Sequence, residues 1–301
     1  MTARGAGYLV ANPHVVEAVD MLYPHAAVAP DGSWRAAPRP PPAARVVPVP
    51  WGRDAFVYCS DRHFFPGLVA SLRSLLAWHP DAPVVVISWD LAPVQEAYLR
   101  GFATVVPREP DLPDDPAWGR FGLFRLDLRR AVYLDADTVV LGPLHELLAA
   151  DAAFAAAPNL DWTLADNFCD PRPLTTLRLD PALPAFNSGV FTAHVSAWGP
   201  AFLAELLDLQ ARFGTDLLYA DQSALQLALN RPGRRFTWLP PRLNAMAEFW
   251  DWTDPDRLPA LVHYAGHEKP WRPDCPYPAQ HFFFRWSKIP APAHLPTVLP
   301  V

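Results

Sequence analysis

The sequence predicts an α/β protein with a mixed, mainly parallel sheet that is flanked by helices. From residue 55 onward, short runs rich in β-forming residues alternate with helical patterns, which is the signature of consecutive βαβ units. The run at 131–134 is apolar enough to be a central strand that is buried on both faces. With 301 residues, 51% of them apolar, the chain can bury one large core or two modest ones.

The elements of the first half follow one another regularly. A strand over 55–60 leads to a helix whose leucines, from Leu68 to Leu76, share one face, and this helix ends before Pro80. The segments after it are predicted as a strand over 83–88, a helix over 94–100, a strand over 103–106, a helix over 120–128 and the strand over 131–134.

The second half predicts longer helices and fewer strands. Residues 187–191 indicate a strand that is entered through a tight turn. A long helix follows, and residues 221–230 predict another one. The long helix is indicated by apolar residues at helical spacing: Phe202, Leu206, Leu209 and Phe213.

Prolines divide the chain into two parts. The sequence contains 37 prolines, and a dense cluster of them lies between Pro38 and Pro50. Such a segment is extended and stiff. We therefore expect residues 1–50 to form an N-terminal extension with a Pro-rich linker, and residues 51–301 to form the main domain.

Charge and cysteine content narrow the classes of function. A net charge of −6 argues against binding to nucleic acid, which needs a positive surface. The three cysteines, Cys59, Cys169 and Cys275, form no CxxC pair, so neither a disulfide framework nor a zinc ribbon is predicted. No run approaches the ~18 apolar residues of a membrane span, and no secretory signal is visible. We expect a cytoplasmic protein.

Two carboxylates follow the predicted buried strand at 131–134. Asp135 and Asp137 flank Ala136, so in an extended segment both side chains point the same way. Like charges at that distance repel each other, and a hard divalent cation removes this cost. The carboxyl edge of a parallel sheet is also where such folds bind ligands. A second Asp-x-Asp, at 254–256, follows no strand, so position favours the first pair as a metal site.

A second polar cluster begins where the apolar pair 261–262 predicts a short strand. A neutral imidazole at His263 would complete a carboxylate site for a metal ion. Gly266 lets backbone N–H groups approach an anion, and Lys269 offers a point charge to a phosphate. Taken singly, each residue is compatible with a structural histidine or a solvated lysine. Their compact order before Pro270 and Trp271 favours a phosphate site.

These segments together resemble glycosyltransferase family 8, which includes glycogenin and the bacterial lipooligosaccharide galactosyltransferases. The resemblance spans about residues 54–272 and rests on four motifs in the family's order: YLDADT at 133–138, FNSGVF at 186–191, DQSAL at 221–225, and HYAG with KPW at 263–271. It implies the GT-A fold, a UDP-sugar donor, manganese (with magnesium as the alternative) and retention of the anomeric configuration.

The resemblance also implies roles for individual residues. Asp135, Asp137 and His263 correspond to the metal ligands. Asp221 and Gln222 correspond to the catalytic pair beneath the anomeric carbon. Residues on both sides of the acid pair are implied in donor binding. Ser60 and Asp61 correspond to contacts with the uracil and ribose, and Arg120, with Arg125 as its rival, to a contact with the donor phosphate or sugar. The remaining donor-binding residues are Asp135 and Ala136 of the Asp-Ala-Asp motif, Asn187 and Ser188 at the sugar, Gly266 and Lys269 at the diphosphate, and Asn159, where the family often has an acidic sugar contact.

The implied reaction transfers a hexose to an acceptor hydroxyl. Its main requirement is to stabilise negative charge on the leaving diphosphate, and the metal with Lys269 and Arg120 would meet it. Gln222 would stabilise the positive sugar centre through its carbonyl oxygen. An inverting reaction would instead need a carboxylate base, such as Asp221 or Glu248, beside the acceptor.

Two other classes of function stay open. A sugar nucleotidyltransferase shares a similar sheet, but it would carry a Gly-rich loop after the first strand, where this chain has residues 59–65 without glycine. A catalytically silent member would bind a nucleotide sugar and serve as a scaffold; the intact acid pair and His263 argue against it. The acceptor can be a saccharide, a small molecule or a peptide, and a homodimer is compatible with the sequence.

Overall fold

The protein is described by a computed structural model that covers residues 26–28, 34–36, 54–150, 152–234, 236–252, 258–272, 275–277 and 279–287. Within the predicted extension over 1–50, the structure describes two short strands, β1 (Ala26–Val28) and β2 (Trp34–Ala36), which pair antiparallel. The Pro-rich linker lies outside the described residues, as does the second Asp-x-Asp at 254–256.

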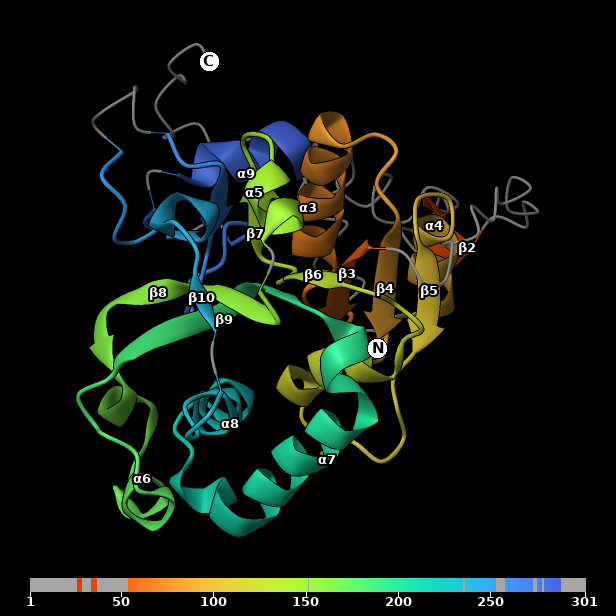
Figure 1. The fold of residues 1–301 in the computed structure, drawn as a ribbon. Coiled ribbons are helices and arrows are strands. Elements are labelled where there is room, and N and C mark those ends of the chain that lie inside the picture. Colours follow the sequence, from red (N-terminus) through yellow and green to blue (C-terminus); the bar gives the residue numbers. More distant parts are fainter. Residues whose placement is uncertain are drawn as a thin grey trace.

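A seven-stranded sheet forms the centre of the fold, in the order β10-β8-β9-β6-β3-β4-β5 (Figure 1). β3 lies parallel to β4 and β6, and β4 lies parallel to β5, whereas β9 runs antiparallel to β6 and β8. This confirms the predicted mixed, mainly parallel sheet. The strands are β3 (Ala55–Ser60), β4 (Val84–Ser88), β5 (Thr104–Pro107), β6 (Ala131–Leu134), β8 (Phe154–Thr163), β9 (Pro184–Ala193) and β10 (Thr237–Trp238).

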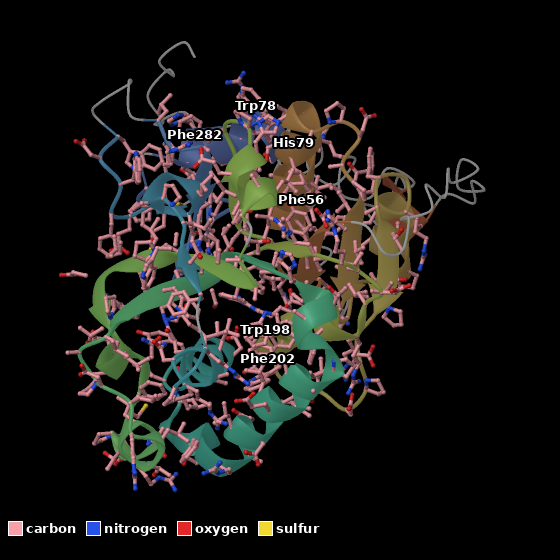
Figure 2. All side chains as sticks on the ribbon, viewed as in Figure 1. Phe56, Trp78, His79, Trp198, Phe202 and Phe282 are labelled. Carbon is pink, nitrogen blue, oxygen red and sulfur yellow. The ribbon has the colours of Figure 1, made fainter. Side chains whose placement is uncertain are left out.

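Helices cover both faces of this sheet because neighbouring residues of each strand point to opposite sides. On β3, Phe56 and Tyr58 pack in the cluster that contains the leucines of α3, whereas Val57 packs in the cluster that contains α7 and α8. Figure 2 shows the two layers, with Phe56 on one side and Phe202 on the other. The α-helices are α3 (Phe65–Trp78), α4 (Pro93–Leu99), α5 (His145–Ala149), α6 (Arg172–Leu177), α7 (Val195–Phe213), α8 (Ala220–Leu229) and α9 (Gln280–Ser287).

A second sheet of three strands lies beside the first one. Its strands are β7 (Thr138–Val140), β11 (Ala245–Met246) and β12 (Leu261–His263), in the order β11-β12-β7. β6 belongs to the large sheet and β7 to the small one, so residues 135–137 form the connection between the two sheets. None of the helices in the described ranges has the length and apolarity that a membrane crossing requires.

The predicted helix over 120–128 differs from the structure. The segment is a 3-10 helix, η1 (Pro116–Arg125), which begins and ends earlier than expected. Asp115 accepts a hydrogen bond from the backbone N–H of Ala117 and so caps the start, and Leu126 is already extended. The other 3-10 helices are η2 (Leu164–Asn167), η3 (Gly214–Asp216) and η4 (Pro241–Leu243).

Candidate active site

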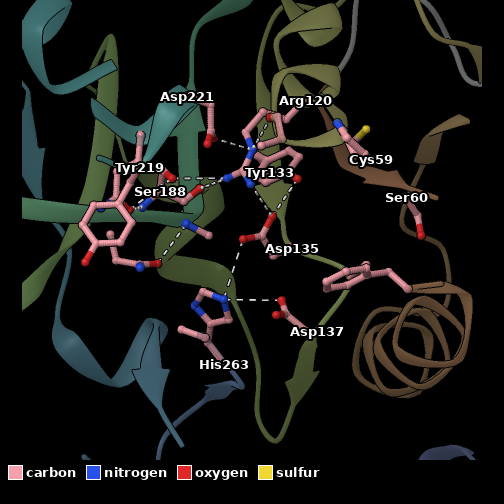
Figure 3. Close-up of a pocket in the computed structure, with 18 of the residues that line it drawn as sticks. Cys59, Ser60, Arg120, Tyr133, Asp135, Asp137, Ser188, Tyr219, Asp221 and His263 are labelled. Carbon is pink, nitrogen blue, oxygen red and sulfur yellow. Dashed lines mark hydrogen bonds and ion pairs between the residues drawn. The ribbon is translucent and has the colours of Figure 1, made fainter. Parts of the chain in front are cut away.

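Asp135, Asp137 and His263 converge at the connection between the two sheets. One ligand atom from each lies within 4.8 Å of the others. His263 Nε2 is 3.7 Å from Asp135 Oδ2 and 3.4 Å from Asp137 Oδ1 (Figure 3). Strand register explains the convergence, because His263 pairs with Thr138, the residue that follows Asp137. The three side chains therefore meet although their sequence positions are far apart.

The donor set fits a divalent cation. Asp137 Oδ1 is buried and accepts no hydrogen bond within the part of the chain that the structure describes. Such an atom is costly unless a cation or a donor satisfies it. Carboxylate oxygens and an imidazole nitrogen suit Mn²⁺, and carboxylate oxygens also suit Mg²⁺. Gly189 leaves room for the cluster, because a Cβ there would overlap the His263 ring and lie 2.8 Å from Asp135 Oδ2.

The two carboxyl groups have different electrostatic surroundings. Burial raises the pKa of Asp135, although the neighbouring Arg120 opposes the shift. Burial would also raise the pKa of Asp137, but Lys269 and His263 outweigh it and hold that pKa below its usual range. Asp137 is therefore an anion, whereas Asp135 holds a proton more readily while no cation is bound.

Arg120 is enclosed by acceptors from several elements. Its guanidinium lies 3.2 Å from Asp135 Oδ1 and 3.0 Å from Asp221 Oδ2. It also donates to the backbone carbonyl of Ser188 at 2.9 Å and covers the ring of Tyr133 at 5.0 Å. Burial would lower the pKa of Arg120, but Asp135 and Asp221 outweigh it and raise that pKa further. Arg120 thus spans the space between the cluster of Asp135, Asp137 and His263 and α8.

Lys269 and Gly266 lie on the other side of the acid pair. Lys269 Nζ is 2.6 Å from Asp137 Oδ2 and donates to the backbone carbonyl of Tyr264 at 2.9 Å. Gly266 has a φ of +86°, in the left-handed region that favours glycine, and a Cβ there would meet nothing within 4 Å. This loop therefore presents a fixed positive charge beside exposed backbone.

Gln222 is held in place at the start of α8. Its Oε1 accepts from the backbone N–H of Ser188 at 2.9 Å, and its Nε2 donates to Asn167 at 3.0 Å. Burial, together with the nearby Asp135, raises the pKa of Asp221 to about 6 against the opposing effect of Arg120. A carboxyl group with such a pKa can change its protonation state near neutral pH.

A cavity of about 430 Å³ gathers most of the predicted site residues. This volume lies within the range of roughly 300–1,000 Å³ that small-molecule sites occupy. The predicted residues that line it are Ser60, Asp61, Arg120, Asp135, Ala136, Asp137, Asn187, Ser188, Asp221, Gln222, His263, Gly266 and Lys269.

Three residues named from the sequence do not line this cavity. Asn159 is buried in β8. Arg125, the rival of Arg120, binds Glu109 and Asp111 instead. Glu248, the alternative base, is exposed and also lies outside the cavity wall.

Other residues of the wall carried no clear signal in the sequence. Tyr133 donates from its hydroxyl to Asp135 Oδ1 at 2.8 Å, although it belongs to an apolar run that predicted only a strand. Phe64 presents a ring to the cavity and packs edge-on against Trp271. Asn244 lies outside this wall, but its Oδ1 is 2.9 Å from His263 Nδ1, and only the pairing of β11 with β12 brings it there.

Comparisons with known proteins all find glycosyltransferases, and one of them names a family. The sequence model of glycosyl transferase family 8 matches residues 116–275, just over half of the chain. Glycosyltransferase GlyF of Streptococcus pneumoniae serotype 4 is 22% identical over an alignment of 244 residues that covers 73% of this chain and 57% of that protein. The lipopolysaccharide 1,2-glucosyltransferase of Escherichia coli K12 is 28% identical over an alignment of 197 residues that covers 57% of this chain and 55% of that protein. The chain thus spans little more than half the length of these relatives.

Solved structures share the fold. The galactosyltransferase LgtC, crystallised with donor and acceptor sugar analogs, aligns with a TM-score of 0.64 at 20% identity, over 82% of this chain and 97% of that one. The bifunctional glycosyltransferase WbbM aligns with a TM-score of 0.64 at 16% identity, over 83% of this chain and 51% of that one. The predicted GT-A fold is therefore confirmed.

Proposed function

Because the chain belongs to glycosyl transferase family 8, we propose that it transfers a hexose from a UDP-sugar to an acceptor hydroxyl, with Mn²⁺ or Mg²⁺ held by Asp135, Asp137 and His263. One observation carries the proposal. The three ligand atoms lie within 4.8 Å of one another, in the wall of a cavity large enough for a nucleotide sugar. A bound divalent cation would supply positive charge for the two phosphates of the donor.

The donor would lie along the cavity with its diphosphate next to the acid pair. Lys269 adds a positive charge there, and the left-handed backbone at Gly266 lets N–H groups approach the phosphate oxygens. Ser60 and Asp61, at the end of β3, would bind the nucleoside. The Phe64 ring offers a flat apolar surface to the base.

The hexose would lie between the acid pair and α8. Asn187, Ser188 and Gln222 present amide and hydroxyl groups toward that part of the cavity. Gln222 Oε1 accepts from the backbone N–H of Ser188 at 2.9 Å and from the Ser188 hydroxyl at 3.3 Å. If that hydroxyl turned to the hexose instead, the carbonyl oxygen would have a lone pair to face a positive sugar carbon. Asn159 lies outside this wall, so its proposed sugar contact would require a donor that reaches beyond the cavity.

We propose that the reaction retains the anomeric configuration. The bond between the anomeric carbon and the diphosphate oxygen breaks, and the acceptor oxygen bonds to the same face of that carbon. The acceptor proton passes to the departing phosphate oxygen. This route requires no carboxylate base. Asp221, which is paired with Arg120, would then position the guanidinium and take no proton from the acceptor.

Release of UDP from a panel of UDP-sugars tests the proposal without knowledge of the acceptor. We expect slow hydrolysis of at least one sugar with Mn²⁺, none with a chelator, and a loss of about 10²-fold or more in Asp137→Asn. Asp208→Asn is the matched control, because Asp208 is an exposed acid on α7. Hydrolysis that survives the chelator would contradict the metal site, and tight UDP-sugar binding without turnover of any sugar would favour a silent scaffold.

A further inference from the structure

We infer that Asn244 is a positioning residue that fixes the tautomer of His263, so that Nε2 keeps a free lone pair for the cation. The inference rests on the proposed metal site and adds a residue to it that binds no ligand itself. It is carried by a relay of three hydrogen bonds behind the imidazole. The backbone N–H of Gly189 and Asn244 Nδ2 both contact Asn187 Oδ1, each at 2.9 Å, and Asn244 Oδ1 lies 2.9 Å from His263 Nδ1.

The direction of this relay is set by its first member. A backbone N–H can only donate, so the side-chain atom of Asn187 that faces Gly189 must be the carbonyl oxygen. That oxygen can only accept, so Asn244 must turn its NH₂ group toward it. The carbonyl oxygen of Asn244 is then left to face the imidazole. It can only accept as well, so His263 Nδ1 must carry the proton.

The opposite tautomer would be unfavourable in this site. It would place the lone pairs of His263 Nδ1 and Asn244 Oδ1 against each other at 2.9 Å. Its new donor, Nε2–H, would face Asp137 Oδ1 at 3.4 Å, which is long for a hydrogen bond. His263 and Asn244 are each only 3% exposed, so water has little access to replace the lost contact.

Backbone pairing holds the relay together. Asn244 directly precedes β11, whose Met246 pairs with His263 on β12. Asn187 and Gly189 lie on β9, in the large sheet. The relay therefore fixes the ring from the side opposite the carboxylates, which Figure 3 shows facing Nε2. Partners of this kind orient a metal-binding histidine and raise its basicity as a ligand.

Nitrogen NMR on the metal-free wild-type protein, with ¹⁵N-labelled histidine and at a pH where the imidazole is neutral, tests the inference directly. We expect the His263 signals of the tautomer that is protonated at Nδ1. Signals of the Nε2–H tautomer would overturn the inference. This measurement needs no substitution, so it decides the matter even if a variant does not fold.

Two variants test the consequence for metal binding, with Mn²⁺ affinity measured by electron paramagnetic resonance. Asn244→Leu removes the acceptor, and we expect Mn²⁺ to bind about 10–100-fold more weakly. Asn244→Asp keeps an acceptor toward Nδ1 but loses the NH₂ donor to Asn187 Oδ1, so we expect a loss of Mn²⁺ affinity that is smaller than in Asn244→Leu. Thermal unfolding identifies variants that remain folded.

The outcomes separate this inference from the proposed function. A wild-type protein that binds no Mn²⁺ would contradict the metal site itself. Normal Mn²⁺ affinity in Asn244→Leu, or an equal loss in folded Asn244→Asp and Asn244→Leu, would overturn the role of Asn244 alone. Hydrolysis of a UDP-sugar by the wild-type protein would stand in either of these last two cases.

Discussion

Gly189 shows how much one missing side chain determines at the residue scale. Its carbonyl accepts from the backbone N–H of Asp135 at 2.7 Å, so β9 lies tightly against the start of the acid pair. Its own N–H begins the relay to His263. Any Cβ at this position would occupy the space of the imidazole. The glycine is therefore part of the site although it offers no functional group.

The substitution Gly189→Ala tests this close approach. The new methyl group would displace the His263 ring, so we expect Mn²⁺ affinity to fall by about 10-fold or more, because ligand geometry is lost. The measurement is a Mn²⁺ titration followed by electron paramagnetic resonance. Gly142→Ala is the matched control, because a Cβ there would meet its nearest neighbour at 3.6 Å, an ordinary contact. Equal affinity in both variants would contradict the account.

Asp221 gives a second prediction at this scale. Its pKa is raised to about 6, chiefly by burial, against about 3.9 in an unfolded chain. Between these values the native state binds more protons than the unfolded state, so Asp221 lowers stability as pH rises from about 4 to about 6. Above about pH 6 Asp221 is ionised in both states, and its raised pKa then lowers the free energy of unfolding by the full amount, roughly 3 kcal/mol.

Urea unfolding of the metal-free protein at a series of pH values measures this effect. Relative to wild type, Asp221→Asn should gain roughly 3 kcal/mol in free energy of unfolding between about pH 4 and pH 7. Stability curves of the two proteins that run parallel across this range would show that burial does not raise this pKa.

At the scale of elements, Arg120 connects η1 to the strands and helices around the cavity. Its partners are Asp135 after β6, Ser188 on β9 and Asp221 on α8. A buried carboxylate that loses its cation is costly, because neither water nor another charge replaces it. The guanidinium therefore stabilises the packing of these elements while it shapes the cavity.

Replacing Arg120 by leucine should lower the free energy of unfolding at neutral pH by about 3–5 kcal/mol, because it leaves two carboxylates without this partner. Arg125→Leu is the control on the same 3-10 helix. Its ion pairs with Glu109 and Asp111 lie at the surface, so we expect a loss of at most about 1 kcal/mol. Urea denaturation measures both values, and similar losses in the two variants would refute the buried role of Arg120.

The elements also show which features could be predicted from the sequence. The strand over 131–134 and the acid pair after it were predictable, because both depend on local pattern. The predicted helix over 120–128 had the wrong bounds, since Asp115 and Pro116 start a 3-10 helix earlier and it ends at Arg125. Asn244 gave no signal, because its partner His263 reaches it only through the pairing of β11 with β12. Local patterns do not encode such register.

At the scale of the whole molecule, the net negative charge of the protein opposes the binding of the proposed donor, a UDP-sugar, which is also an anion. The net charge is −6, so attraction must come from local groups. Arg120 already faces Asp135 and Asp221, and Lys269 faces Asp137. Because these cations are already paired with protein carboxylates, we propose that a bound divalent ion would supply most of the positive charge for the diphosphate, with Lys269 adding to it. The connection between the two sheets is where the fold brings together the proposed ligands, Asp135, Asp137 and His263.

Anomalous X-ray diffraction near the manganese absorption edge, from crystals grown with Mn²⁺ and UDP, tests most directly whether Asp135, Asp137 and His263 hold one cation against the diphosphate. We predict one strong peak at about 2.0–2.3 Å from carboxylate oxygens of Asp135 and Asp137 and from His263 Nε2, with both phosphates of UDP against the same ion. A manganese peak bound to UDP but remote from His263, or UDP bound in the cavity with no peak at all, would contradict the account.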